Sequence, residues 1–169
     1  MRTSVLIVGG GLAGLNLARR LHLAGVDFHL LEARDRLGGR VLTHDGFDLG
    51  PSWFWPGSQP RLAEVVQDLG LKVFAQHDEG DVVFHRMSRE APRRYRGFAQ
   101  APQSMRIAGG TGALIAAIAE TLPADRLHLS STVTQVTLDD VVAASVARAD
   151  GSQTAWTTDH IAFAAPPRL

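Results

Sequence analysis

A Gly-x-Gly-x-x-Gly motif at residues 9–14 constrains the fold of this chain more than any other feature of its sequence. It directly follows the apolar run of residues 4–8, which is typical of a strand buried on both faces. Residues 12–24 then show apolar side chains at helical spacing, up to a Gly25 suited to end a helix. Residues 27–32 predict a second strand. Strand, helix and strand within about thirty residues indicate a βαβ unit in a parallel sheet.

Each glycine of this motif has a physical role in binding a dinucleotide. Gly9 allows a tight turn out of the strand, Gly11 lets the backbone approach a pyrophosphate, and Gly14 lets the helix pack closely on the strand. The helix start offers N–H groups and partial positive charge to phosphates. Glu32 follows Gly14 by 18 residues, where its carboxylate can accept hydrogen bonds from both ribose hydroxyls. That charge disfavours NADP, whose adenosine 2′-phosphate would lie beside it.

The composition excludes several classes of function. The 169 residues include 17 Lys plus Arg and 17 Asp plus Glu, so the net charge is zero and neither nucleic acid nor an anionic membrane is expected as a partner. The lack of cysteine excludes disulfides and a catalytic thiol, and it fits a cytoplasmic protein. No run approaches the about 18 apolar residues of a membrane span, and no signal peptide is visible. The histidines lack metal-ligand spacing, so we predict no metal site.

Beyond the βαβ unit the sequence predicts further helices and strands. Helices are expected at 60–69 and 111–121, and a hairpin at 41–49. Strands are expected at 72–75, 82–85, 95–98, 126–129, 133–138, 141–148 and 160–164.

A second glycine motif lies just beyond Glu32. Residues 32–40 read EARDRLGGR, and residues 9–15 read GGGLAGL. Together these segments resemble the N-terminal fingerprint of the flavin-containing amine oxidase superfamily. The resemblance implies FAD rather than NAD as the cofactor, with Arg34 beside the adenosine ribose. It also implies that residues 38–40 pass the pyrophosphate and the flavin.

Four further segments extend the resemblance in the family's order. Residues 48–56 (DLGPSWFWP) look like the stretch that runs under the flavin ring. Residues 104–114 (SMRIAGGTGAL) look like the family's R-x-x-G-G-x-x-x-L start of a helix. Residues 131–136 (STVTQV) resemble the strand whose valine meets adenine through backbone groups. Residues 161–167 (IAFAAPP) resemble the family's strand that ends in A-P-P.

The resemblance implies an α/β fold: a Rossmann-like FAD-binding βαβ domain with a parallel sheet, a β-meander and a reduced part of a substrate domain. It implies an FAD-dependent oxidoreductase of amine oxidase type, in which a hydride passes from a C–N substrate to flavin N5 and oxygen reoxidises the flavin. The implied substrate is a small molecule such as an amine. No residue stands out as catalytic. The implied cofactor-binding residues are Gly9, Gly11, Leu12, Ala13, Gly14, Glu32, Ala33, Arg34, Gly38, Gly39, Arg40, Gly50, Pro51, Ser52, Trp53, Val133 and Ala164.

Complete members of the superfamily are much longer than this chain. We expect an FAD-binding βαβ unit and flavin loop at 1–58, a partial substrate-domain insertion at 59–103, and a return to the FAD-binding domain at 104–169. The family's C-terminal half, with its Gly-Asp pair and a lysine near flavin N5, has no counterpart here; the only lysine, Lys72, is expected on the surface. An isolated half would expose a sheet edge and an interface, so we expect association with another copy or a second chain.

Two alternatives remain open at this point. A desaturase or protoporphyrinogen-oxidase-like flavoprotein would share the N-terminal fingerprint, although the aromatic stretch at 50–56 favours the amine oxidase branch. A non-catalytic FAD- or nucleotide-binding subunit, or a remnant, would keep the fold without a complete active site. Arg36 is expected in a solvated loop. We expect four histidines to be surface or packing residues and not catalytic ones, namely His44, His77, His85 and His128.

Overall fold

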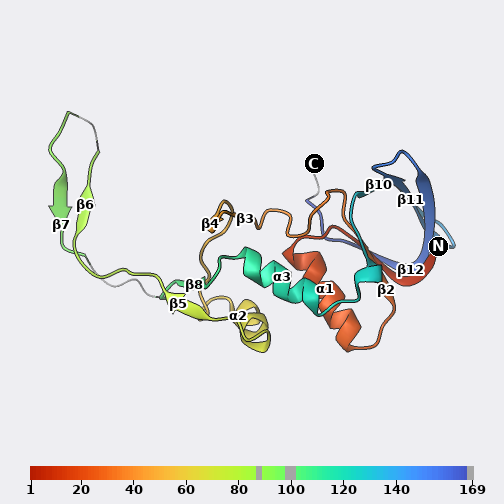
Figure 1. Cartoon of the computed structure of the whole chain (residues 1–169), viewed down its shortest axis with the longest axis horizontal. Coiled ribbons are helices and arrows are strands. Elements are labelled where there is room, and N and C mark those ends of the chain that lie inside the picture. The colour runs from red at the N-terminus through yellow and green to blue at the C-terminus, as the bar shows by residue number, and fades with distance from the viewer. Residues whose placement is uncertain (87–88, 98–101, 167–169) are drawn as a thin grey trace.

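The computed structural model describes residues 1–86, 89–97 and 102–166. Its N-terminal part is the predicted βαβ unit, made of β1 (Arg2–Val8), α1 (Leu12–Leu23) and β2 (Phe28–Leu31), as Figure 1 shows. β1 and β2 are parallel neighbours. Two predicted positions, Phe98 of a strand and Pro167 of the A-P-P segment, lie outside the described residues.

Six strands form the main sheet, in the order β10–β11–β12–β1–β2–β9. β12, β1, β2 and β9 run parallel to one another, whereas β10, β11 and β12 form an antiparallel meander. The predicted parallel sheet with a β-meander is therefore confirmed. Besides β1 and β2, the strands of this sheet are β9 (Leu127–His128), β10 (Ser131–Leu138), β11 (Val142–Arg148) and β12 (Gln153–Phe163).

β12 is longer than the strand predicted at 160–164, because it has two different partners. Its first half pairs with β11, where Trp156 lies opposite Ala144. Its second half pairs with β1, where Ile161 lies opposite Leu6. A single strand thus joins the meander to the parallel part of the sheet. In addition, a short 3-10 helix at Ala124–Arg126 occupies the start of the strand predicted at 126–129.

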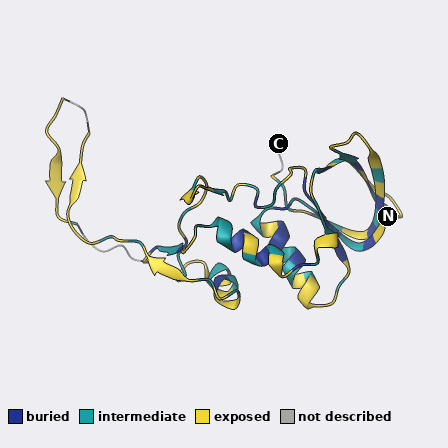
Figure 2. Ribbon diagram, in the orientation of Figure 1, coloured by how far each residue is buried: buried dark blue, intermediate teal, exposed yellow. Residues whose placement is uncertain are grey.

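Both faces of the sheet are covered, because the adjacent residues Leu6 and Ile7 of β1 point to opposite faces and both are fully buried. Ile7 faces one core cluster together with Leu15 of α1 and Ile118 of α3 (Gly112–Glu120). Leu6 faces a second cluster, which includes Trp156 of the meander. Figure 2 shows these buried positions concentrated in the two helices and the sheet. No helix in the described ranges is long and apolar enough to cross a membrane.

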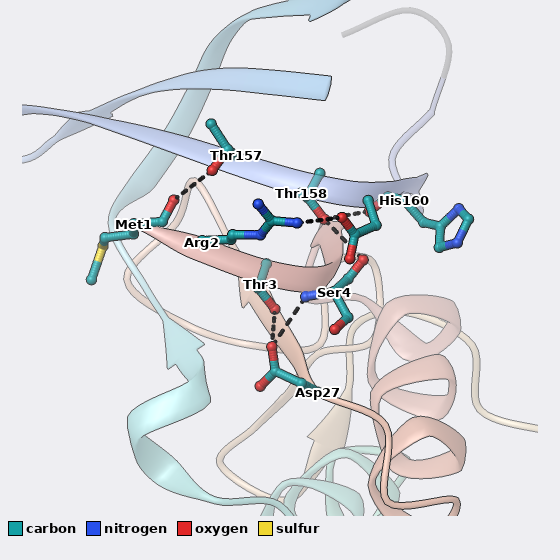
Figure 3. A network of polar contacts seen from close by, with 9 residues as sticks. Met1, Arg2, Thr3, Ser4, Asp27, Thr157, Thr158 and His160 are labelled. Atoms are coloured by element: carbon teal, nitrogen blue, oxygen red, sulfur yellow. Dashed lines mark hydrogen bonds and ion pairs between the residues drawn. The ribbon is translucent and has the colours of Figure 1, made fainter. Parts of the chain in front are cut away.

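Polar side chains attach the N-terminal end of β1 to both of its neighbours (Figure 3). Thr3 Oγ1 and the Ser4 backbone N–H donate to Asp27 Oδ2 at 2.8 and 3.1 Å. These hydrogen bonds lower the pKa of the Asp27 carboxyl below its usual value. Arg2 pairs with Asp159 of β12 at 3.0 Å, but both side chains are exposed, and such pairs contribute at most about 1 kcal/mol.

The remaining elements leave the body of the sheet. They are β3 (Thr43–His44), β4 (Phe47–Asp48), α2 (Pro60–Asp68), β5 (Val73–Ala75), β6 (Val82–Phe84), β7 (Arg93–Tyr95) and β8 (Met105–Ile107). β6 and β7 form a hairpin that stands apart from the sheet and its helices (Figure 1). The strand predicted at 95–98 is wrong in position, since β7 pairs with β6 over residues 93–95. β8 was expected only as the approach to a helix, and it forms a strand because β5 lies beside it.

Two histidines meet beneath the meander. His29 Nδ1 of β2 lies 2.8 Å from His128 Nε2 of β9, and both rings lie against Trp156. Burial lowers the pKa of both histidines, and for His128 the neighbouring His29 lowers it further. Because two protonated rings at this distance would repel and neither could accept, the pair needs at least one neutral imidazole, whose unprotonated nitrogen accepts the N–H of the other ring.

We expect acid to weaken the fold through this histidine pair. In the unfolded chain both groups titrate near the ordinary value of 6.5, whereas their folded pKa values are lower. The unfolded state therefore binds more protons below pH 6.5, and stability falls as the pH drops from there toward the folded pKa values. Urea unfolding at about pH 7.5 and about pH 5.5 should give a smaller free energy of unfolding at the lower pH. The double variant His29→Phe/His128→Phe should lose part of that difference, and an unchanged pH dependence would contradict this assignment.

Candidate dinucleotide-binding site

The turn from β1 into α1 requires glycine at two positions. Gly9 has a φ of +113°, which side-chain-bearing residues rarely adopt, and a Cβ there would lie 2.9 Å from the Ala164 carbonyl oxygen. A Cβ on Gly14 would overlap the carbonyl oxygen of Gly9. Glycine at both positions therefore lets β1, β12 and α1 approach one another closely.

Gly11 differs from these two glycines because nothing crowds it. It is the N-cap residue of α1 with an ordinary φ of −74°, and a Cβ built on it would have no atom within 4 Å. As the N-cap residue, Gly11 makes no side-chain capping bond to α1, and the first turn of α1 has no acidic residue. The helix start thus presents its N–H groups and partial positive charge to open space, an arrangement that suits a phosphate group.

Glu32 lies directly after β2 and is only 8% exposed. Its Oε2 accepts a hydrogen bond from the Gly10 N–H at 2.6 Å, and its Oε1 accepts one from the Arg34 N–H at 3.0 Å. These bonds offset the cost of burying a carboxylate. Because an ionised carboxylate has about four acceptor positions, others remain for a ligand hydroxyl.

The second glycine motif lies against the first. The Gly38 N–H donates to the carbonyl oxygen of Gly10 at 2.8 Å. Gly39 has a φ of +58°, and a Cβ there would lie 3.3 Å from Gly11 Cα. The two loops therefore form one continuous backbone surface around the start of α1.

Two arginines stabilise the second loop through one carbonyl group. Arg34 Nη1 and Arg36 Nη2 donate to the carbonyl oxygen of Gly39 at 3.3 and 2.9 Å. The expectation of a solvated Arg36 was wrong, because its guanidinium is partly buried against this loop. Arg40 is exposed and extends from the same loop.

These elements surround a cavity of about 820 Å³ at the C-terminal ends of β1 and β2. This is the end of a parallel sheet at which ligands bind, and the volume is within the range of small-molecule sites. The structure brings most of the predicted site residues to its wall. Those are Gly9, Gly11, Leu12, Ala13, Glu32, Ala33, Arg34, Gly38, Gly39, Arg40, Pro51, Val133 and Ala164.

Four predicted residues are not part of the cavity wall. Gly14 lies beneath the first loop, and a Cβ on Gly50 would overlap the Arg40 carbonyl oxygen. Trp53 is 51% exposed and donates to Gln76 Oε1 at 3.0 Å. Ser52 is the fourth, so Pro51 alone represents this segment on the cavity wall.

The sequence analysis missed one side of the cavity, which α2 forms. Its apolar spacing predicted a helix but gave no indication of which neighbours that helix would have. Thr132 and Ser131 were missed although they precede the predicted Val133. The wall residues absent from the prediction are Val8, Asn16, Leu31, Val41, Arg61, Leu62, Val65, Ser131, Thr132, Ala165 and Pro166.

The chemistry of the wall suits a dinucleotide. Arg34, Arg40 and Arg61 can form ion pairs with phosphate oxygens, while the Glu32 carboxylate can accept hydrogen bonds from ribose hydroxyls. Much of the remaining wall is apolar and suits the faces of flat rings. No group of side chains able to hold a metal ion occurs in the part of the chain that the structure describes.

Comparison with known families agrees with this site. The family model described as "Flavin containing amine oxidoreductase" matches residues 12–103 and 87–169. The two matches together extend over most of the chain.

Individual relatives match over a shorter region. A probable flavin-containing monoamine oxidase A of Dictyostelium discoideum is 45% identical over 80 residues, which is 45% of this chain and 17% of that protein. The human flavin-containing amine oxidase B is 34% identical over 98 residues, 55% of this chain and 19% of that protein. A putrescine oxidase of Kocuria rosea is 43% identical over 84 residues, 47% of this chain and 17% of that protein. The matched regions thus amount to less than a fifth of these relatives.

Solved structures confirm the predicted FAD-binding fold. A putrescine oxidase bound to putrescine superimposes with a TM-score of 0.81 at 22% identity, covering 99% of this chain and 59% of that one. The rebeccamycin biosynthetic enzyme RebC with reduced flavin gives a TM-score of 0.59 at 20% identity, covering 96% and 32%. At these identities the likeness is one of fold alone.

Gly11→Val tests whether the open space above Gly11 is a ligand site. The side chain should fit the isolated protein, because a Cβ meets nothing within 4 Å, but it would occupy the phosphate position. We expect the unfolding midpoint to change little and FAD affinity to fall at least about tenfold, as measured by flavin fluorescence titration. Gly57→Val is the matched control, since a Cβ there meets only Pro102 Cβ at 4.0 Å, away from the cavity wall. Full FAD affinity in Gly11→Val would refute the site.

Proposed function

Because the chain belongs to the family of flavin containing amine oxidoreductases, we propose that it binds FAD and forms the cofactor-binding part of an amine-oxidase-type oxidoreductase. One observation is the main support for this proposal. The uncapped helix start at Gly11 and the buried carboxylate of Glu32 lie on the wall of the same cavity. Phosphate and ribose require these two kinds of group.

Each end of the cavity has a role in this proposal. The pyrophosphate would lie over Gly11 and receive N–H groups of the helix start, with Arg34 and Arg40 available as counter-charges. Glu32 would accept hydrogen bonds from the hydroxyls of the adenosine ribose, and the backbone of Val133 would contact adenine. Pro51 and residues 38–40 would then border the flavin end.

FAD, when bound, supplies the two-electron oxidation of a C–N bond. The residues of this chain bind and orient it, and they exclude water from the side nearest α1. The names of the relatives, which are amine, polyamine and putrescine oxidases, support a small amine as substrate over a desaturase-type reaction. We propose the division at residues 1–58, 59–103 and 104–169. Most of the cavity wall comes from the first and last of these segments, and α2 of the middle segment supplies one side through Arg61, Leu62 and Val65.

A non-catalytic FAD-binding subunit is the second candidate. It is favoured because no residue of the sequence stands out as catalytic. In that case the protein would take up the cofactor without oxidising an amine.

Cofactor binding and turnover can be measured separately. The purified chain, incubated with FAD and desalted, should retain flavin absorbance in about equimolar amount, since the cavity has the size of one small-molecule site. Peroxide release is then followed with putrescine, a longer polyamine and an aromatic monoamine. Bound flavin with peroxide release supports the oxidase. Bound flavin without it supports the subunit, and no bound flavin refutes both.

We further propose that a second polypeptide, another copy or another chain, covers the β6–β7 hairpin. The side chains of Val82, Val83, Phe84 and Tyr95 are 50–64% exposed there, and Figure 2 shows both strands of the hairpin in the exposed colour. A two-stranded hairpin in water is marginally stable unless its apolar face is packed. We expect light scattering after size-exclusion chromatography to give a mass above that of the monomer, and Phe84→Ser to reduce the associated fraction. A monomer that binds no apolar dye would contradict this.

A further inference from the structure

Asp48, at the end of β4, is contacted by two threonines through one of its oxygen atoms. Thr43 Oγ1 donates to Asp48 Oδ1 at 2.6 Å. The backbone N–H of Thr111 donates to the same oxygen at 2.9 Å, and Thr111 Oγ1 lies 3.0 Å from it. We call Asp48, Thr43 and Thr111 the Asp48 cluster. It joins the β3–β4 hairpin to the start of α3 across 63 positions of sequence.

The cluster supplies the cap that α3 otherwise lacks. Thr111 is the N-cap residue of α3 but makes no capping bond with its own side chain. The N–H groups of Thr111 and Gly112 are instead bound by Asp48 Oδ1 and Thr43 Oγ1, the latter at 2.8 Å. A Cβ on Gly110 or Gly112 would lie 2.8 Å from Thr43 Oγ1, so glycines make this close approach feasible.

The same cluster is attached to the wall of the cofactor cavity. Thr111 Oγ1 lies 2.9 Å from the carbonyl oxygen of Pro51, a wall residue. On the opposite strand of the hairpin, Thr43 follows two residues after the wall residue Val41. Deeper in the helix, Ile115 lies beneath Gly38, since a Cβ on Gly38 would be 3.4 Å from its side chain. The Asp48 cluster and Ile115 together therefore attach the segment 38–51 to α3 at both of its ends.

We propose that Asp48 and Thr43 are positioning residues for the cofactor: by capping α3 they hold Arg40, Val41 and Pro51 where they border bound FAD. This inference rests on the proposed function. Neither side chain lines the cavity, so the effect is transmitted through the backbone of the segment 38–51.

The charge of Asp48 fits this role. Burial acts to raise its pKa, but the hydrogen bonds from Thr43 and Thr111 outweigh burial and lower the pKa below its usual value. Asp48 is therefore a carboxylate at neutral pH, and negative charge is favourable at the start of a helix. An uncharged replacement loses both this interaction and part of the hydrogen bonding.

Four variants of the full chain test the proposal by FAD titration at neutral pH. Asp48→Asn removes the charge, and Thr43→Val removes the hydroxyl at nearly constant size. Both are expected to weaken FAD binding about tenfold, because hydrogen bonds to a charged group are lost. Thr43→Ser keeps the hydroxyl and should bind FAD within about twofold of the original chain. Asp150→Asn is the matched control, since that carboxylate caps a distant turn by accepting the Ser152 N–H.

The absorbance spectrum of bound flavin at saturation separates positioning from mere stability. A shifted wall should change the flavin bands in Asp48→Asn and Thr43→Val but not in Thr43→Ser. Unchanged affinity and an unchanged bound spectrum in folded Thr43→Val would overturn the proposal even if its unfolding midpoint fell. If Asp48→Asn does not fold, the pair Thr43→Val and Thr43→Ser decides. Failure of the original chain to bind FAD would instead refute the proposed function.

Discussion

The buried carboxylate of Glu32 is the interaction on which the site depends. Its two oxygens accept the N–H groups of Gly10 and Arg34, so it binds both glycine loops at once. Its own backbone bonds to His128 and Ser131, which places the β9–β10 turn beside the same point. A carboxylate with so little exposure is tolerated only when hydrogen-bonded, so the loops and the acid must form together. Hydrogen bonds within this chain therefore organise the site.

Local patterns explain what the sequence alone could predict. The spacing of Gly9, Gly11 and Gly14 predicts a tight turn into a helix, and the structure has that turn where expected, with glycine required at Gly9 and Gly14. The wall formed by α2 and the capping of α3 by Asp48 were not predictable in this way. Both depend on residues far apart in sequence, such as Asp48 and Thr111, and apolar spacing does not identify a helix's neighbours. The double pairing of β12 was missed for the same reason.

The sheet relates these distant parts through its two faces. Ile7 and Leu6 are adjacent in β1 but belong to different cores, one with the helices and one with Trp156. The His29–His128 pair lies against that tryptophan, close to the turn that reaches Glu32. His128 thus contacts Trp156 of the second core with its ring and accepts the Glu32 N–H with its carbonyl oxygen. By contrast, the β6–β7 hairpin contacts neither core.

This contrast has a functional consequence. The cofactor cavity is built from hydrogen-bonded loops on a doubly covered sheet, so its shape follows from contacts within this chain. Val82 and Phe84 of the exposed hairpin belong to neither core cluster, and the proposed partner would cover them. The proposed cofactor site and the proposed contact surface of the hairpin therefore depend on different sets of contacts in this protein.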